Sequence, residues 1–107
     1  MAGSGKQGFS GDGVDPLAAT FNGPKHAEVD AQNRLLVVDT ENHAVRRIDW
    51  KENRIETVAG TGRKGAQGIG GPANQLELNR PHGVWVDPSG WLWISDSSNN
   101  RVVRVRP

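Results

Sequence analysis

The chain contains an internal repeat, which constrains its fold more than any other feature of the sequence. Residues 2–50 align with residues 59–107 at a constant offset of 57 positions and without a gap. Loop and strand positions keep one register: Val29 aligns with Val86, and an aspartate follows the valine in both copies. A repeat of this kind is one supersecondary unit that needs a neighbour to cover its faces. The chain is therefore expected to fold as two similar units packed together.

Each copy has the pattern of short strands separated by turns. In the second copy apolar and polar residues alternate, which is typical of strands with one buried face. Asp87, Pro88 and Gly90 hold positions that these residue types favour in a β-turn. The second copy predicts three strands, at 83–87, 91–96 and 101–106. The first copy predicts four, at about 26–30, 34–39, 44–49 and 55–59, and short helical turns are expected only around 17–20 or 75–78.

Composition narrows the class of protein further. Apolar residues make up 35% of the chain and there are 14 glycines, which favours layered, turn-rich β-structure over a large apolar core. The sequence has no cysteine, so disulfides and thiolate metal sites are excluded. The formal net charge of +1 does not indicate binding to nucleic acid or to an anionic membrane. No apolar run approaches the roughly 20 residues of a membrane span.

The motifs of both copies resemble the NHL repeat, which is named after an Asn-His-Leu signature. The family pattern runs Leu-Asn-x-Pro-x-Gly-Val-x-Val-Asp, then a turn and a strand, then Asp-x-x-Asn-x-x-Val. Residues 78–87 match its first part, residues 38–46 match its second part, and 58–62 resemble the family's blade junction. The first copy departs at 25–28, where Gly-Val is expected, so its first strand should be less regular.

The resemblance implies an all-β fold made of two antiparallel blades of an NHL-type β-propeller, most often six-bladed in this family. It divides the chain into four segments: a Gly-rich blade-junction loop at 1–20, a four-stranded first blade at 21–59, a Gly-rich inter-blade connection at 60–77, and a truncated, three-stranded second blade at 78–107. Two blades cannot close a ring, which typically needs about four to eight. We therefore expect a piece of a longer propeller or a unit that self-assembles, for example as a trimer.

Glycine-rich stretches at 3–8 and 60–65 satisfy the pattern Gly-x-Gly-x-x-Gly. In a dinucleotide site such a loop leads into a helix whose N-terminus holds the pyrophosphate. Here the second stretch continues into 66–72, which is rich in glycine and ends in proline. We therefore interpret these glycines as parts of the blade junctions, and no nucleotide or other cofactor is expected.

Four polar residues recur at the turn after the second strand of each copy: Asp39, Asn42, Asp96 and Asn99. Aspartate at such a place accepts backbone N–H bonds from the turn that it opens, and asparagine tolerates a positive φ. We therefore predict that all four are structural turn residues. A metal-binding or acid–base role for the two aspartates is the alternative.

Two arginines align on the third strand of each copy, Arg47 and Arg104, and two more, Arg46 and Arg101, lie nearby. One interpretation is an ion pair between an arginine of this strand and the turn aspartate. The alternative is a basic stripe that binds a partner.

Three tryptophans of the second copy, Trp85, Trp91 and Trp93, have no aromatic counterpart in the first copy, where Glu28, Arg34 and Leu36 stand. The repeat itself does not require aromatic residues at these positions. The tryptophans form either a packing layer between blades or an exposed anchor for a partner. Together with Arg101 and Arg104 they are the candidate partner-binding residues.

These observations favour a scaffold or binding module for protein partners or further blades, without enzymatic activity and without a membrane partner. The three histidines, His26, His43 and His82, have no zinc-site spacing, and no Ser-His-Asp series or nucleophile elbow occurs. No catalytic, cofactor-binding or metal-binding residue is therefore predicted. Two alternatives remain: a piece of a six-bladed propeller enzyme, lactonase-like or amidating-lyase-like with a metal in its central channel, and an RNA-binding NHL propeller.

Overall fold

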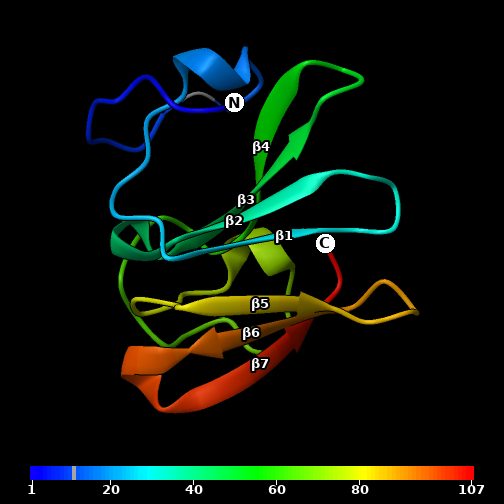
Figure 1. The fold of residues 1–107 in the computed structure, drawn as a ribbon. Coiled ribbons are helices and arrows are strands. Elements are labelled where there is room, and N and C mark those ends of the chain that lie inside the picture. Colours follow the sequence, from blue (N-terminus) through cyan, green and yellow to red (C-terminus); the bar gives the residue numbers. More distant parts are fainter. Residues whose placement is uncertain (11) are drawn as a thin grey trace.

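Two antiparallel β-sheets lie one above the other in the computed structural model, which describes residues 1–10 and 12–107 (Figure 1). The first sheet contains, in spatial order, β1 (His26–Val29), β2 (Leu35–Asp39), β3 (Ala44–Asp49) and β4 (Arg54–Ala59). The second sheet contains β5 (Gly83–Val86), β6 (Leu92–Asp96) and β7 (Arg101–Val105). The prediction of an all-β fold with four strands followed by three is confirmed.

The only helical elements in the described residues are four short 3-10 turns. Two of them, η1 (Pro16–Ala18) and η3 (Ala73–Gln75), lie close to the two predicted helical turns. The other two, η2 (Thr40–Asn42) and η4 (Ser97–Asn99), occupy the turns between the second and third strands of each sheet. No described helix has the length and apolar character that crossing a bilayer would require.

The turn that joins the first two strands is built in the same way in both sheets. In the first sheet Asp30 Oδ1 accepts hydrogen bonds from the backbone N–H groups of Gln32 and Arg34, each at 2.9 Å. In the second sheet Asp87 Oδ1 accepts from Ser89 at 2.9 Å and from Trp91 at 3.1 Å. An aspartate whose carboxylate accepts hydrogen bonds from the backbone N–H groups of the turn that it begins fixes the register of the hairpin.

Strand β1 is as regular as its counterpart β5, contrary to the prediction. All four of its residues pair with β2, from His26 opposite Val38 to Val29 opposite Leu35. The Gly-Val pair of the family pattern is therefore not needed for pairing. The reason is that the backbone, rather than the side chain, supplies the hydrogen bonds of a ladder.

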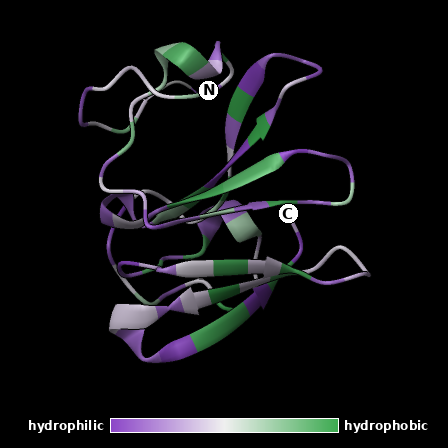
Figure 2. Ribbon diagram, in the orientation of Figure 1, coloured by the Kyte–Doolittle hydropathy of each residue, from purple (hydrophilic) through white to green (hydrophobic). Residues whose placement is uncertain are grey.

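The main core lies between the two sheets, and Figure 2 shows hydrophobic positions, in green, along the strands of both. It contains residues of both sheets and of the connecting segment: Leu36, Val38, Val45, Val58, Ala59, Ala73, Leu76, Leu78, Val84, Leu92, Ile94 and Val103. A second cluster lies on the other face of the first sheet, where Ala19, Val37, Ile48 and Ile55 are buried together. The N-terminal segment thus covers a face of the first sheet.

The outer face of the second sheet, which points away from the first sheet, has no comparable cover among the described residues. The side chains of Trp85, Trp93 and Val102 lie there, exposed to 52%, 37% and 65%. The two sheets form an incomplete ring with one open blade face, as expected for two propeller blades.

Candidate functional site

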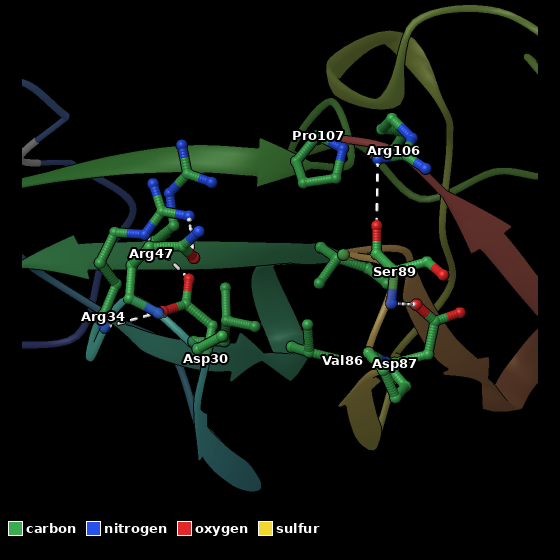
Figure 3. A pocket seen from close by; sticks show the side chains of 14 residues that line it. Asp30, Arg34, Arg47, Val86, Asp87, Ser89, Arg106 and Pro107 are labelled. Atoms are coloured by element: carbon green, nitrogen blue, oxygen red, sulfur yellow. Dashed lines mark hydrogen bonds and ion pairs between the residues drawn. The ribbon is translucent and has the colours of Figure 1, made fainter.

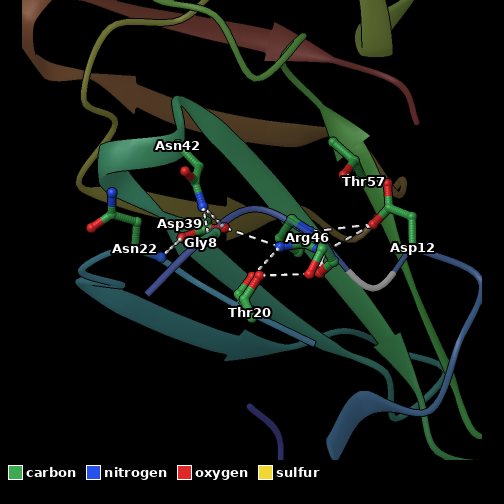
Figure 4. A network of polar contacts seen from close by, with 9 residues as sticks. Gly8, Asp12, Thr20, Asn22, Asp39, Asn42, Arg46 and Thr57 are labelled. Carbon is green, nitrogen blue, oxygen red and sulfur yellow. Dashed lines mark hydrogen bonds and ion pairs between the residues drawn. The ribbon is translucent and has the colours of Figure 1, made fainter. Parts of the chain in front are cut away.

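The turn after β2 is held by a polar network centred on the fully buried Asp39 (Figure 4). Asp39 Oδ1 accepts a hydrogen bond from the backbone N–H of Asn22 at 2.8 Å. Its Oδ2 accepts from Asn42 Nδ2 at 2.9 Å and from Arg46 Nη1 at 3.1 Å. Asn42 Nδ2 also donates to the carbonyl oxygen of Gly8 at 2.7 Å, which ties the turn to the N-terminal segment.

Arg46 is the largest fully buried side chain of the described residues, and its guanidinium is surrounded by acceptors. Besides Asp39, it donates to the carbonyl oxygens of Ser10 at 2.8 Å and Thr20 at 3.1 Å. It also forms an ion pair with Asp12 at 3.0 Å. A buried charge is tolerated only when it is paired and hydrogen-bonded, and here both conditions are met. The network is therefore part of the structural core of the first blade.

The second sheet repeats this network around Asp96, which is also fully buried. Asp96 accepts from the backbone N–H of Asn79 at 2.7 Å, from Asn99 Nδ2 at 2.8 Å and from Arg101 Nε at 2.7 Å. Arg101 Nη2 further donates to the carbonyl oxygen of Glu77 at 3.2 Å. Glu77 is the repeat counterpart of Thr20, so the guanidinium meets an equivalent carbonyl acceptor and turn aspartate in both blades.

The arginines that perform this role are not the pair that the repeat aligns. Arg46 aligns with Val103, and Arg101 aligns with Ala44. The aligned arginines have other partners: Arg47 forms an ion pair with Glu56 at 2.6 Å, and Arg104 stacks on tryptophan rings. An ion pair between a third-strand arginine and the turn aspartate is thus present in both blades, with Arg101 serving it in the second. The guanidinium of Arg101 is consequently directed away from the candidate partner-binding set.

The hydrogen bonds of Asp39 and Asp96 bear on the alternative of a metal or acid–base role. Each carboxylate accepts from backbone, asparagine and arginine donors of the chain itself. In the described residues no three side chains of histidine, aspartate, glutamate or cysteine are grouped so that they could hold a metal ion. The contacts of both aspartates are those of structural turn residues.

Aromatic and basic side chains gather on the outer face of the second sheet. Trp85 on β5 lies opposite Trp93 on β6, and Trp93 lies opposite Arg104 on β7. The guanidinium carbon of Arg104 lies 5.6 Å from the centre of the Trp93 ring and 4.2 Å from that of Trp91. Arg106 stacks on Trp91 at 4.4 Å. We define the Trp–Arg face as Trp85, Trp91, Trp93, Val102, Arg104 and Arg106. These stacking contacts hold two of its tryptophans and both of its arginines in place.

A hydrogen bond at the edge of this face orients Trp93. Its Nε1 donates to Asp87 Oδ2 at 2.9 Å. This hydrogen bond is the main cause that lowers the pKa of the Asp87 carboxyl below its usual range, with the turn N–H groups and nearby Arg104 acting in the same direction. Asp87 therefore stays ionised and keeps the indole ring fixed along the sheet.

The first sheet shows what happens to the equivalent face when it is covered. Trp93 corresponds to Leu36, which is 1% exposed and belongs to the core between the sheets. Val102 corresponds to Val45, which is fully buried in the same core. The Trp–Arg face is thus the second blade's version of a surface that, in the first blade, contacts protein.

A polar cleft of about 360 Å³ lies between the turns of the two sheets, near the C-terminus (Figure 3). Its charged groups are engaged with neighbours: Arg34 pairs with Asp30 at 2.8 Å, and Arg106 donates to the carbonyl oxygen of Ser89 at 3.2 Å. No sequence pattern indicated this cleft, because it is formed by two turns that lie far apart along the chain.

A second group of contacts joins the sheets at the opposite end. Glu41 and Arg80 form an ion pair at 2.8 Å, and the hydrogen bond from Arg80 is the first cause that lowers the pKa of Glu41. The backbone N–H of Arg80 donates to His43 Nδ1 at 3.0 Å, and Thr40 Oγ1 donates to the carbonyl oxygen of Pro81 at 2.7 Å. Burial lowers the pKa of His43, which favours the neutral ring that accepts this bond. The sequence analysis missed these contacts because they join different blades.

Comparisons with known proteins agree with this architecture. The family model described as NHL repeat matches residues 78–105. The chloroplastic protein SUPPRESSOR OF QUENCHING 1 of Arabidopsis thaliana is 40% identical over 87 residues, which are 79% of this chain and 8% of that protein. NHL repeat-containing protein 2 of Homo sapiens is 33% identical over 92 residues, which are 78% of this chain and 12% of that protein. The chain thus spans only about a tenth of the length of these relatives.

Solved structures show the same fold at low sequence identity. A protein of unknown function from Bacteroides thetaiotaomicron has a TM-score of 0.84 at 22% identity, over 97% of this chain and 26% of that one. An auxiliary nutrient binding protein from the same organism has a TM-score of 0.76 at 21% identity, over 94% of this chain and 26% of that one. From the repeat motif, the named relatives and the two-sheet architecture together, we conclude that the chain belongs to the NHL-repeat β-propeller family.

Proposed function

We propose that the chain is a protein-binding scaffold and that its docking surface is the Trp–Arg face of the second sheet. The observation that carries this proposal is the exposure of Trp93 at 37%, where the first blade buries the counterpart Leu36 against protein, with Trp85 exposed at 52% beside it. Exposed aromatic side chains beside arginine are the usual anchors of protein interfaces, because they bury a large area and keep polar contacts at the rim.

The interface inside the chain indicates the chemistry of the partner. There, apolar residues of the second sheet, such as Val84 and Ile94, pack against Leu36 and Val45 of the first. Across the Trp–Arg face, no carboxylate of the described residues lies within ion-pair distance of Arg104. A partner would therefore present an apolar sheet face with a carboxylate placed to meet Arg104.

A second copy of the chain offers exposed groups of this kind where the N-terminal segment leaves the first sheet accessible. Val29 is 55% exposed on β1, and the Asp12 side chain, 49% exposed, lies at the same side beside Thr57. Head-to-tail contact of this kind continues the blade stacking seen between the two sheets, so that the surfaces are heterologous and can close into a ring. We therefore take a second copy of the chain as the partner for the test.

The proposal gives the chain no catalytic role. The two buried carboxylates, Asp39 and Asp96, accept hydrogen bonds from donors of the chain itself. Such groups hold a turn and are poorly suited to take up a proton from a substrate, which requires an acceptor within reach of the reacting atom.

Light scattering coupled to size exclusion over a wide range of protein concentration tests the proposal. We expect concentration-dependent association of the parent chain and a monomer for Trp85→Arg, because the change removes an aromatic anchor and would bury a charge without a partner in the interface. Trp50→Arg is the matched control, since Trp50 is 44% exposed in the β3–β4 turn and lies outside the Trp–Arg face. A parent chain that stays monomeric up to about 1 mM, or association that Trp85→Arg leaves unchanged, would overturn the proposal. Salt-dependent binding of single-stranded RNA to the parent chain would favour the RNA-binding alternative instead.

A further inference from the structure

The polar cleft between the two sheets, which we call the junction cleft, combines positively charged walls with an apolar lining (Figure 3). Its two walls are the hairpin turns at 30–34 and 87–91, each of which lies between two strands of its own sheet. The apolar lining includes Leu36, Val86 and Leu92. Its volume of about 360 Å³ is in the range of pockets that hold a small molecule.

Three arginines reach the junction cleft from different strands. Arg34 stands directly before β2, Arg47 lies on β3, and Arg106 directly follows β7. Figure 3 shows Arg34 and Arg47 on the side of the first blade and Arg106 on the opposite side, beside the turn of the second blade. A molecule that spans the cleft would therefore meet a guanidinium at each end.

Arg34 is held in position and still has donors left. Its Nε donates to Asp30 Oδ2 at 2.8 Å, and its Nη2 donates to Gln32 Oε1 at 3.1 Å. Asp30 Oδ1 is occupied by the backbone N–H groups of the same turn. Among the residues that the structure describes, none accepts a hydrogen bond from Nη1 of Arg34. The guanidinium is thus oriented in advance, with one end free for a ligand.

The other two arginines are oriented in the same manner. Arg47 uses Nε and Nη2 for Glu56 Oε1, and Arg106 uses Nη1 for the carbonyl oxygen of Ser89. Within the described part of the chain, Nη1 of Arg47 and both Nε and Nη2 of Arg106 donate to no side chain or carbonyl group. Each wall of the cleft therefore offers guanidinium donors that the chain itself does not satisfy.

The repeat does not require two of these three arginines. Arg34 stands where the second copy has Trp91, and Arg106 stands where the first copy has Asp49. Arg34 also shares a sheet face with Arg47, because Arg47 lies opposite Leu36 and residues two apart on a strand point to the same side. Like charges placed so close repel each other, and an anion between them would remove the repulsion. The positive walls thus belong to this junction and not to the blade fold in general.

We infer that the junction cleft binds a small organic acid with two or more carboxylates, one held by Arg34 and Arg47 and another by Arg106. The planar guanidinium matches a carboxylate and binds it through two parallel hydrogen bonds. The apolar lining between the walls suits the carbon chain that separates the carboxylates, whereas inorganic phosphate has no such part. The inference does not depend on the proposed function of the Trp–Arg face.

Isothermal titration calorimetry of the complete chain with citrate, at constant ionic strength, tests the inference. We expect saturable binding with a Kd of about 1 mM or tighter, and binding of acetate and of inorganic phosphate at least about tenfold weaker. Arg34→Gln and Arg106→Gln, one on each wall, should each weaken citrate binding about tenfold. Arg63→Gln makes the same change at an exposed site outside the cleft and should leave the affinity unchanged.

Backbone amide chemical shifts locate the bound citrate. The signals of the turns at 30–34 and 87–91 should shift together on titration, and shifts confined to other segments would contradict the inference. It would be overturned equally by no saturable binding up to about 10 mM citrate, by acetate or phosphate binding as tightly as citrate, or by unchanged affinity in either arginine variant. Trp85→Arg, which lies outside the cleft, should abolish self-association and bind citrate as the parent chain does, so that the two proposals can fail separately.

Discussion

The two blades build the same polar turn network with arginines from different strand positions. In the first blade the guanidinium belongs to Arg46 and is completely buried, with Asp39 and Asp12 as carboxylate partners. In the second it belongs to Arg101, whose side chain is 25% exposed and has Asp96 alone as carboxylate partner. The comparison shows that the fold requires a positive group at one place in space rather than an arginine at one place in the sequence.

The blades also differ in what covers them. The first sheet has four strands and protein on both faces, whereas the second has three strands and an open Trp–Arg face. Equivalent positions in the two blades therefore serve as controls for each other. The following predictions use such pairs, beginning with the largest expected effect.

The aspartates of the two networks should differ in their contribution to stability. Asp39→Ala leaves the fully buried Arg46 without its buried partner and should lower the free energy of unfolding by about 3–5 kcal/mol. Asp96→Ala should cost about 1–3 kcal/mol, because Arg101 can reach water. Urea unfolding of both variants measures the difference. Should Asp39→Ala fail to fold, Asp39→Asn and Asp96→Asn give the same ranking, and equal losses would contradict the comparison.

The covered and the open sheet faces should respond differently to loss of a large side chain. Leu36→Ala creates a cavity in the core between the sheets and should cost about 2–5 kcal/mol. Trp93→Ala, at the equivalent position of the open face, should cost about 1 kcal/mol or less, mainly from lost stacking with Arg104. Thermal unfolding at low protein concentration, where self-association is minimal, provides the measurement. A larger loss for Trp93→Ala would show that this face is covered in solution.

The blade-junction glycines Gly3 and Gly60 have nearly the same backbone, with φ values of 95° and 93°. Alanine at either position is strained by about 1–2 kcal/mol. At Gly60 the added Cβ would also overlap the carbonyl oxygen of His43 and lie 2.8 Å from the Ala44 Cα, whereas at Gly3 it meets only the Phe21 ring at 3.4 Å. Gly60→Ala should therefore cost about 1–3 kcal/mol more than Gly3→Ala. Equal unfolding midpoints for the two variants would contradict this close approach.

The contact between His43 and Arg80 should make the stability of the chain depend on pH. Burial lowers the pKa of His43 in the folded state, so the unfolded chain binds more protons than the folded chain below the unfolded pKa of about 6.5. The contribution of His43 to the free energy of unfolding is fully present above that pH. It is lost as the pH falls towards the folded pKa of His43. His43→Asn places the second blade's residue, Asn100, at this position and keeps a side chain that tolerates positive φ. Unfolding at pH 7.5 and 5.5 should show a smaller acid loss for this variant, and identical pH profiles would exclude the effect.

Much of the fold follows from the sequence alone because its determinants are local. Alternation of apolar residues predicted the strands, and Asp30 and Asp87 marked the turns between the first two strands of each blade. The offset of 57 positions predicted that the two blades are alike, and the NHL motif indicated how they stack. Asp39, Asn42, Asp96 and Asn99 were recognisable as residues of the turn because both copies share them. The positive φ expected at the two asparagines instead falls on the next residues, His43 and Asn100.

The tertiary structure alone decided which arginine meets each aspartate. Arg46 and Arg101 stand two positions apart in the aligned repeats, and residues two apart on a strand point to the same face. Two residues span about 7 Å along a strand, and the long, flexible arginine side chain can cover that distance from either site. The alignment of Arg47 with Arg104 was therefore no guide to pairing. The exposure of the Trp–Arg face likewise depends on which blade lies next to which, because burial is a property of neighbours in space.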